Sequence, residues 1–333
     1  MRELNRKGED ELELSTKQAL LDALRAAPDR WQSGAALARL LGVSRNAVWK
    51  AAEELRAEGL ALESVPRRGY RIGTGGELFT AEEFRTRLGP GWQAEVWPSL
   101  TSTNDRARAA AAEGVAGPLL VAATVQTSGR GRRGRAFFSP PGSGLYFSLL
   151  LRPALLAVDA PLVTAAAAVA ARRALLQFGV QLEIRWVNDL MSDGKKAGGI
   201  LTESVSNLED GGLEYLVAGF GLNLTSPADG FPSSLPEAGA LFGGELPVGR
   251  AQIAAAIALE FEQLIQRLPE ADFMSEYREA NLLQPGTQVF VSPARGEQYP
   301  ALVQQIDPSG RLVVKTSDGQ LQVLTGGEVF IAE

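Results

Sequence analysis

Four arginines and three glycines form the densest group of chemically useful side chains in the sequence, Gly129-Arg130-Gly131-Arg132-Arg133-Gly134-Arg135. Glycines let a backbone pass close to a ligand, and guanidinium groups hold phosphates and carboxylates through paired hydrogen bonds. The run has the G-x-G-x-x-G spacing of dinucleotide-binding loops, but the residues after it, Ala136–Gly142, include two prolines and cannot begin the helix which that fold requires. It also lacks the Lys-Ser/Thr ending of a P-loop. We therefore expect this arginine loop (residues 129–135) to fold over an oxyanion; a solvated basic loop or an RNA-binding arginine–glycine patch is the alternative.

A lysine beside glycines is the second candidate. An apolar strand runs into Asn188 and Asp189, and Lys196 follows a short turn, directly before the glycine-rich start of the next strand, Ala197–Ile200. Its charge at a position of close backbone approach fits a role beside a phosphate or a negatively charged transition state. The alternative is an ordinary lysine on a surface hairpin.

Polar residues at the start of a predicted helix, about 103–113, are the third candidate. Ser102-Thr103-Asn104-Asp105 is a typical cluster for capping the helix N-terminus, and that is the simpler interpretation. Hydroxyl groups at a helix N-terminus can equally bind a small polar ligand.

Two residue types are missing from the chain, which has no cysteine and no histidine. Their absence excludes disulfides, thiolate nucleophiles, Ser-His-Asp catalysis and the metal sites that depend on Cys or His. An enzyme of this composition must work with Lys, Arg, Asp, Glu, its backbone or a bound ion, and no metal ligands can be named from the sequence.

Residues 15–73 differ in charge from the rest of the chain. They hold ten Lys and Arg against six Asp and Glu, whereas the whole chain has a net charge of −6, so this segment is expected to have partners of its own. Helical and alternating spacing predicts three helices and a strand pair, over 18–26, 35–41, 45–58, 60–65 and 69–72. Gly42 is placed to end the second helix and Ser44 to cap the third. This is the layout of a winged helix-turn-helix.

The third helix and the wing carry outward polar residues that suit the reading of DNA. These are Arg45, Asn46, Trp49, Lys50, Arg67 and Arg68. The alternative is a packing module with ordinary surface charges.

The remaining elements predict a multidomain α+β protein. Residues 79–283 contain strands joined by hairpin turns, with helices at about 161–178 and 250–267, and form the expected catalytic domain with a mixed sheet. Its expected strands are 92–98, 119–126, 144–152, 182–187, 197–204 and 213–224. Short strands and turns in residues 285–333 predict a small SH3-like β-barrel. Before these domains, 15–73 is the DNA-binding domain, 73–76 a glycine-rich linker and 1–14 a charged tail.

The N-terminal residues are charged throughout, and no apolar run reaches the 18 residues of a membrane span. We expect a cytoplasmic protein without a membrane partner.

The chemically active segments together resemble one family, the bacterial biotin–protein ligases that double as biotin operon repressors. The carrying pieces are Ser102-Thr103-Asn104, Gln126 with the arginine loop, Trp186-Val187-Asn188-Asp189, Lys196-Ala197-Gly198-Gly199-Ile200 and Gly219-Phe220-Gly221-Leu222-Asn223. The arginine loop and the lysine motif are specific in combination, whereas the helix-turn-helix is generic.

The resemblance implies a role for each matching residue. Biotin would be bound by Ser102, Thr103, Asn104, Gln126, Arg130, Gly131, Arg132 and Lys196. The nucleotide would meet Arg132, Phe137, Asn188, Asp189 and Asn223. Lys196 and Arg132 would be the catalytic residues, with Lys196 against the biotin carboxylate and the α-phosphate. Phe137 stands where tryptophan is common in the family, and Val187 where proline is usual, which predicts a smaller stacking surface and a less rigid loop.

The implied reaction uses ATP, Mg²⁺ and biotin, and passes through biotinyl-5′-AMP to the biotin carboxyl carrier protein. A carboxylate can approach a triphosphate only when positive charges offset the repulsion between them. Neither step needs a Cys or His nucleophile, which fits a chain that has neither residue. The implied partners are the carrier protein, operator DNA and a second copy of the chain, with dimerisation promoted by the adenylate through the central sheet. The alternatives are a lipoate or octanoate ligase, a ligand-sensing repressor without ligase activity, and a ligase whose helix-turn-helix only stabilises the fold.

Overall fold

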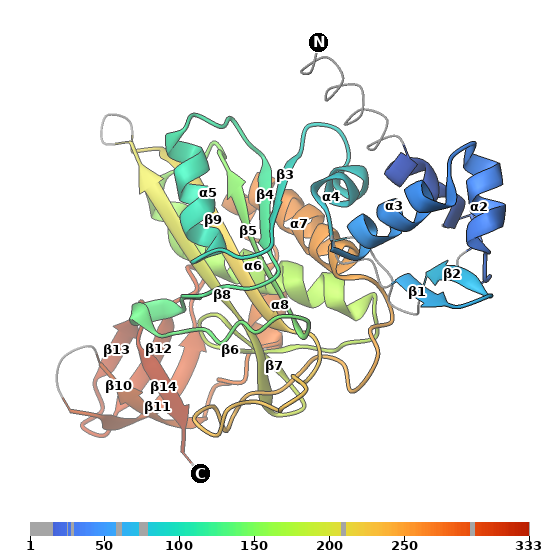
Figure 1. Cartoon of the computed structure of the whole chain (residues 1–333). Coiled ribbons are helices and arrows are strands. Elements are labelled where there is room, and N and C mark those ends of the chain that lie inside the picture. The colour runs from blue at the N-terminus through green and yellow to red at the C-terminus, as the bar shows by residue number, and fades with distance from the viewer. Residues whose placement is uncertain are drawn as a thin grey trace. The chain divides into compact units, whose positions relative to one another are not determined.

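The computed structural model describes residues 16–24, 26–27, 30–57, 62–72, 79–207, 211–293 and 297–332 (Figure 1). The predicted charged tail and the glycine-rich linker lie outside them. The chain divides into two compact units, one of Met1–Glu83 with Glu245–Ala251, the other of Phe84–Gly244 with Gln252–Glu333. Each unit is described by itself.

The first unit contains the helix-turn-helix. Its helices are 16–24, α2 (Gly34–Leu41) and α3 (Arg45–Ala57). Gly42 ends α2 in the left-handed conformation at φ 67°, and the Ser44 hydroxyl accepts a hydrogen bond of 3.1 Å from the Ala47 amide at the start of α3. Both end signals read from the sequence are therefore confirmed.

Buried leucines from all three helices, together with Val48, Ala51 and Ala52 of α3, form the core of this unit. The wing is the antiparallel pair β1 (Leu62–Val65) and β2 (Gly69–Ile72), closed by a turn at 66–68. The Trp31 ring lies under the arginines of the wing, 4.9 Å from the Arg71 guanidinium and 5.9 Å from that of Arg68.

A seven-stranded mixed sheet organises the second unit, in the order β3-β4-β5-β9-β8-β7-β6. Only β3 and β4 run parallel; the other neighbours are antiparallel. The strands are β3 (Gln93–Trp97), β4 (Leu119–Ala123), β5 (Gly144–Leu151), β6 (Glu183–Arg185), β7 (Asp189–Ser192), β8 (Lys195–Ser206) and β9 (Leu213–Asn223). The mixed sheet is confirmed, but the prediction of one strand over 182–187 was incomplete, because the chain turns at 186–188 and returns as β7.

Helices cover both faces of this sheet (Figure 1). Alanines of α5 (Thr103–Ala112) pack on one face against Leu119, Val121, Leu150 and Val217. On the other face, the stacked rings of Phe147 and Phe220 meet Phe261 of α7 (Arg250–Gln266), and Thr164 of α6 (Ala160–Leu176) bonds Thr202. Two further helices, α4 (Ala81–Leu88) and α8 (Met274–Glu279), were not predicted, because each has too few apolar residues to show a helical period.

The C-terminal strands form a five-stranded antiparallel sheet, β13-β12-β11-β10-β14. They are β10 (Gln288–Ser292), β11 (Tyr299–Ile306), β12 (Leu312–Thr316), β13 (Leu321–Leu324) and β14 (Glu328–Ile331). Short strands are present as predicted, but among the described residues β13 and β14 do not pair with each other, so a closed barrel is not confirmed. The sheet is held to the larger one by hydrogen bonds from Trp186 Nε1 to the Gly310 carbonyl at 2.9 Å and from Arg278 Nε to the Ile306 carbonyl at 2.8 Å.

No helix among the described residues is long and apolar enough to span a bilayer.

Candidate active site

A cavity of about 480 Å³ lies in the second unit, where the arginine loop, the start of α5, β7–β9 and residues 327–330 of the C-terminal sheet meet. Every residue singled out for substrate chemistry lines it. These are Ser102, Thr103, Asn104, Gln126, Arg130, Gly131, Arg132, Phe137, Asn188, Asp189, Lys196 and Asn223. Segments separated by more than a hundred residues thus supply one site.

The start of α5 forms a buried polar wall of the cavity. Gln126 Oε1 accepts hydrogen bonds from the Thr103 amide at 2.9 Å and the Thr103 hydroxyl at 3.2 Å. Ser102 occupies the N-cap position and is 3% exposed, but its side chain makes no capping hydrogen bond. The interpretation of this cluster as a simple helix cap therefore fails for Ser102, whose hydroxyl lines the cavity.

Both polar atoms of the Asn104 side-chain amide make hydrogen bonds within the protein. Its Nδ2 donates to the Leu201 carbonyl at 3.1 Å and to Glu203 at 2.7 Å, and its Oδ1 accepts from the Ser148 hydroxyl at 2.6 Å. A Cβ atom at Gly219 would stand 1.9 Å from Asn104 Oδ1, so the glycine makes room for this amide. These hydrogen bonds join α5 to β5 and β8, and the predicted contact of Asn104 with biotin stays a prediction.

The arginine loop is a narrow hairpin. The Phe137 amide donates to the Gly129 carbonyl at 2.8 Å, and the Gly131 amide donates to the Arg135 carbonyl at 2.7 Å, with a 3₁₀ turn over Arg132–Gly134 between them. A Cβ atom at Gly129 would stand 2.6 Å from the Phe137 carbonyl, so this position requires glycine.

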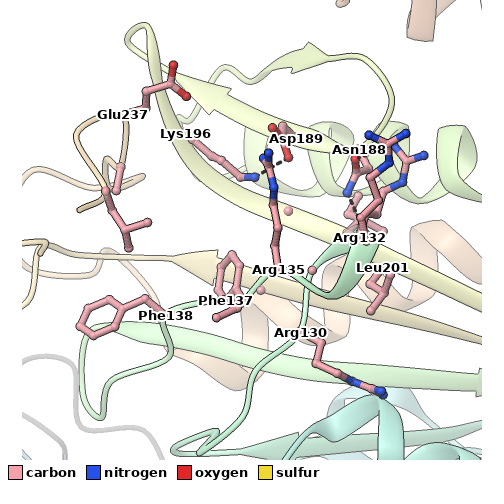
Figure 2. A pocket seen from close by; sticks show the side chains of 18 of the residues that line it. Arg130, Arg132, Arg135, Phe137, Phe138, Asn188, Asp189, Lys196, Leu201 and Glu237 are labelled. Carbon is pink, nitrogen blue, oxygen red and sulfur yellow. Dashed lines mark hydrogen bonds and ion pairs between the residues drawn. The ribbon is translucent and has the colours of Figure 1, made fainter. Parts of the chain in front are cut away.

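The four arginines of the loop turn to three different partners, and Figure 2 labels Arg130, Arg132 and Arg135. Arg132 faces Asn188, with Nη1 3.4 Å from Oδ1, while Arg133 and Arg135 both meet Glu328 of the C-terminal sheet. Arg130 instead pairs with Asp105 at the start of α5. Burial lowers the pKa of Arg132, and the charge of Arg133 lowers it further, although the guanidinium stays charged. An anion bound in the cavity would offset both the burial of the Arg132 charge and its repulsion by Arg133.

Lys196 reaches across Gly199 and forms an ion pair with Asp189, Nζ to Oδ1 2.5 Å (Figure 2). The other oxygen of Asp189 accepts from Arg185 at 2.9 Å, and Arg185 also bonds Glu237 at 3.0 Å. Burial would lower the pKa of Arg185, but its hydrogen bonds to these two carboxylates outweigh burial and raise it. The lysine therefore lines the cavity, and its role beside a phosphate stays a prediction.

The remaining predicted nucleotide residues also line the cavity. The Phe137 ring lies so close to Gly221 that a Cβ there would stand 2.6 Å from it. Asn188 Nδ2 donates to the Ile200 carbonyl at 2.6 Å, and Asn223 Nδ2 donates to the Gly239 carbonyl at 3.0 Å. Both side-chain amides therefore hydrogen-bond to the backbone of segments that line the cavity.

Several lining residues were missed by sequence reasoning, namely Phe138, Arg185, Phe231, Leu235, Glu237, Glu328 and Phe330. Arg185 ends β6, and the others lie in loops or in the C-terminal sheet; none of them carries a motif of its own.

A magnesium ion would find few protein ligands here. Within the described residues no group of three or more Asp and Glu side chains is placed to hold a metal, and Asp189 already serves Lys196 and Arg185. Mg²⁺ commonly binds through substrate phosphates with one or two carboxylates, so such an arrangement fits a metal that arrives with the nucleotide.

The residues predicted to read DNA lie in the first unit. Arg45, Asn46, Trp49 and Lys50 occupy exposed positions on α3, and the Trp49 side chain is 54% exposed. Arg67 and Arg68 are exposed at the tip of the wing. Exposure agrees with the prediction, and contact with DNA stays a prediction.

Three family models match the chain. They are a helix-turn-helix domain over residues 16–71, the biotin/lipoate A/B protein ligase family over 96–223 and the biotin protein ligase C terminal domain over 295–331.

Curated relatives match nearly the whole chain. The bifunctional ligase/repressor BirA of Bacillus spizizenii is 32% identical over 312 residues, covering 91% of this chain and 95% of the relative. BirA of Escherichia coli is 27% identical over 316 residues, covering 90% and 93%. The solved biotin protein ligase of Aquifex aeolicus, in complex with biotin and ATP, gives a TM-score of 0.57 at 22% identity over 72% of this chain and 98% of that chain. The structural likeness shows a shared fold.

Proposed function

Because the chain belongs to the family of bifunctional biotin–protein ligases and repressors, we propose that it forms biotinyl-5′-AMP from biotin and ATP, transfers biotin to a lysine of a biotin carboxyl carrier protein, and represses transcription through its helix-turn-helix. The observation that carries the proposal is the meeting of the arginine loop and Lys196 in one cavity, across a buried polar wall at the start of α5.

In the first step, a carboxylate oxygen of biotin bonds to the α-phosphorus of ATP, and pyrophosphate leaves. Lys196 and Arg132 supply the positive charge that offsets the repulsion between carboxylate and triphosphate. Ser102, Thr103 and Gln126 offer hydroxyl, amide and carbonyl groups to the ureido end of biotin. Arg130 and Gly131 lie in the loop above it.

The nucleotide takes the end of the cavity lined by Phe137, Asn188, Asp189 and Asn223. The Phe137 ring offers a flat apolar surface to the adenine, and Asn188 holds both β8 and Arg132. Mg²⁺ bound to the triphosphate would neutralise charge there, and Asp189 would be the carboxylate of this region that could hold it. In the second step, the amine of the carrier lysine bonds to the acyl carbon, the bond to the phosphate oxygen breaks, and AMP leaves with Lys196 beside its charge.

The domains divide this work. Residues 15–73 bind operator DNA, 79–283 carry both chemical steps, and 285–333, the SH3-like module of the prediction, closes one side of the cavity through residues 327–330. The 1–14 tail is given no role. A cytoplasmic location fits all three partners of the protein.

A second copy of the chain joins through the end of the central sheet. Leu156, Val158 and Val205 are exposed there, with Val158 77% exposed. Leu156 pairs with Gly212, and Val205 lies on the neighbouring strand β8 of the same hairpin. Exposed apolar side chains at one place on a sheet favour a partner surface.

The test is ATP–pyrophosphate exchange with Mg²⁺, comparing biotin, lipoate and no added acid. Exchange with biotin alone supports the ligase. Exchange with lipoate alone would assign the chain to lipoate ligases, and a folded protein that exchanges with neither acid would favour a sensing repressor.

A further inference from the structure

Arg130 is the one arginine of the loop that turns toward α5 (Figure 2). Its Nη2 lies 2.5 Å from Asp105 Oδ1, and both side chains are about one third exposed, 37% and 36%. The same carboxylate oxygen accepts from Arg108, one turn further along α5. Arg108 also reaches Glu203 of β8 at 3.3 Å, so Arg108 has a second carboxylate, whereas Asp105 is the only ion-pair partner that Arg130 has in the described part of the chain.

The pair joins the two walls that a biotin-sized ligand would touch. Asp105 directly follows Thr103 and Asn104 in the first turn of α5, and Arg130 directly follows Gly129 at the base of the arginine loop. The other side of that base is fixed by the backbone, through the Phe137–Gly129 hydrogen bond and the pairing of Arg130 with Ala136. The ion pair therefore links a side chain of the loop itself to the helix, in addition to the hydrogen bonds that join Thr103 to Gln126 just before the loop.

We infer that Asp105 is a positioning residue that holds Arg130, and with it the base of the arginine loop, closed over the ligand end of the cavity. The inference rests on the proposed ligase function for its kinetic consequences. With the link intact the loop is already near its working position, so less ordering is needed when biotin binds, and the adenylate is kept from water until the acceptor lysine arrives.

A structural role is the rival interpretation, because an acidic residue in the first turn also stabilises a helix through its dipole. The variant Asp105→Asn keeps the size of the side chain and removes its charge. Arg108→Gln tests whether Asp105 acts through Arg108, and Asp272→Asn, which breaks an exposed ion pair with Arg267 away from the cavity, controls for the loss of an ion pair in general.

The first measurement needs no enzyme activity. Trypsin cleavage after the loop arginines 132, 133 and 135 is followed in the ligand-free full chain, together with the thermal midpoint. We expect Asp105→Asn to raise the cleavage rate about two- to fivefold, the size measured for partly exposed ion pairs. Arg108→Gln and Asp272→Asn should leave the rate unchanged. An unchanged rate in Asp105→Asn, or an equal rise in Arg108→Gln, would overturn the inference whether or not the protein is a ligase.

The second measurement is kinetic. In ATP–pyrophosphate exchange, Asp105→Asn should raise the KM for biotin about two- to fivefold with kcat nearly unchanged, and should speed the loss of adenylate to solvent. In an Arg130→Gln background the same substitution should add nothing, because its partner is already gone. Full additivity, or a fall in kcat and thermal midpoint without a change in KM, would assign Asp105 to helix stability instead. A wild-type chain without exchange would refute the ligase proposal and leave the trypsin result standing.

Discussion

Lys196 and Lys195 are neighbours that the pleat of β8 sends to opposite faces, and only Lys196 lines the cavity. We predict that Lys196→Ala slows biotin-dependent ATP–pyrophosphate exchange about 10²–10³-fold, the range for removing one group that stabilises transition-state charge. Unfolding free energy should fall by about 1 kcal/mol or less, because the ammonium group is partly exposed and Asp189 keeps Arg185. Lys195→Ala is the matched control, and equal losses of rate and stability in Lys196→Ala would make the lysine a structural residue.

Gly219 has no side chain, and this leaves room for the Asn104 amide. Gly219→Ala places a methyl group where the Asn104 amide lies, and that amide is held by Ser148, Leu201 and Glu203. We expect a loss of about 1–3 kcal/mol in unfolding free energy, typical of overpacking, and a higher KM for biotin because α5 is displaced. Gly243→Ala, with nothing within 4 Å, is the control for chemical denaturation and kinetics. Equal stability of the two variants would show that the wall can adapt.

For single residues, the reactive side chains could be identified from the sequence, but their partners could not. Charge, glycines and spacing marked the arginine loop and Lys196. Nothing in the sequence linked Arg135 to Glu328 or Arg130 to Asp105, because these pairs depend on a fold that brings distant segments together.

Among the elements, α3 tests the DNA-binding half of the proposal. Arg45→Gln removes an exposed charge at the start of this helix, so it should leave stability and ligase activity unchanged. Operator affinity should fall, and the slope of log affinity against log salt should shrink by about 0.9 if the arginine contacts one phosphate. Gel-shift titration at several salt concentrations measures both, with Lys315→Gln in the C-terminal sheet as control. An unchanged affinity and slope would remove Arg45 from the DNA interface.

Elements were predictable where their period was long and their ends were marked. Ser44 and Gly42 marked helix ends in the first unit, and alternating apolar residues located most strands of the second. The predicted strand 182–187 ran past the true end of β6 because Trp186 is buried and continues the apolar pattern of Ile184. The strand β7 was missed because it begins at Asp189, directly after the polar Asn188. The small barrel was inferred from short strands and turn signals, and these do not determine whether a sheet closes.

For the whole molecule, the exposed apolar side chains at the end of the central sheet predict its assembly. Val158→Asp should prevent association in the presence of biotin and ATP, because a charge would be buried at the interface, while ATP–pyrophosphate exchange should persist. Sedimentation velocity with and without ligands measures this, and Leu321→Asp, 65% exposed on the C-terminal sheet, is the control. Ligand-promoted dimers of Val158→Asp would place the interface elsewhere.

The pairing of cations in the cavity has a consequence for how substrates enter. Lys196 is held by Asp189 and Arg135 by Glu328, so the protein supplies its own counterions. For the proposed substrates the site would work as an ion exchanger: an incoming carboxylate or phosphate would take over these two cations from the internal carboxylates, while Arg130 stays with Asp105, and little net charge would be desolvated at any stage. Binding becomes a change of partners, which allows a strongly cationic cavity to exist inside a chain whose net charge is −6.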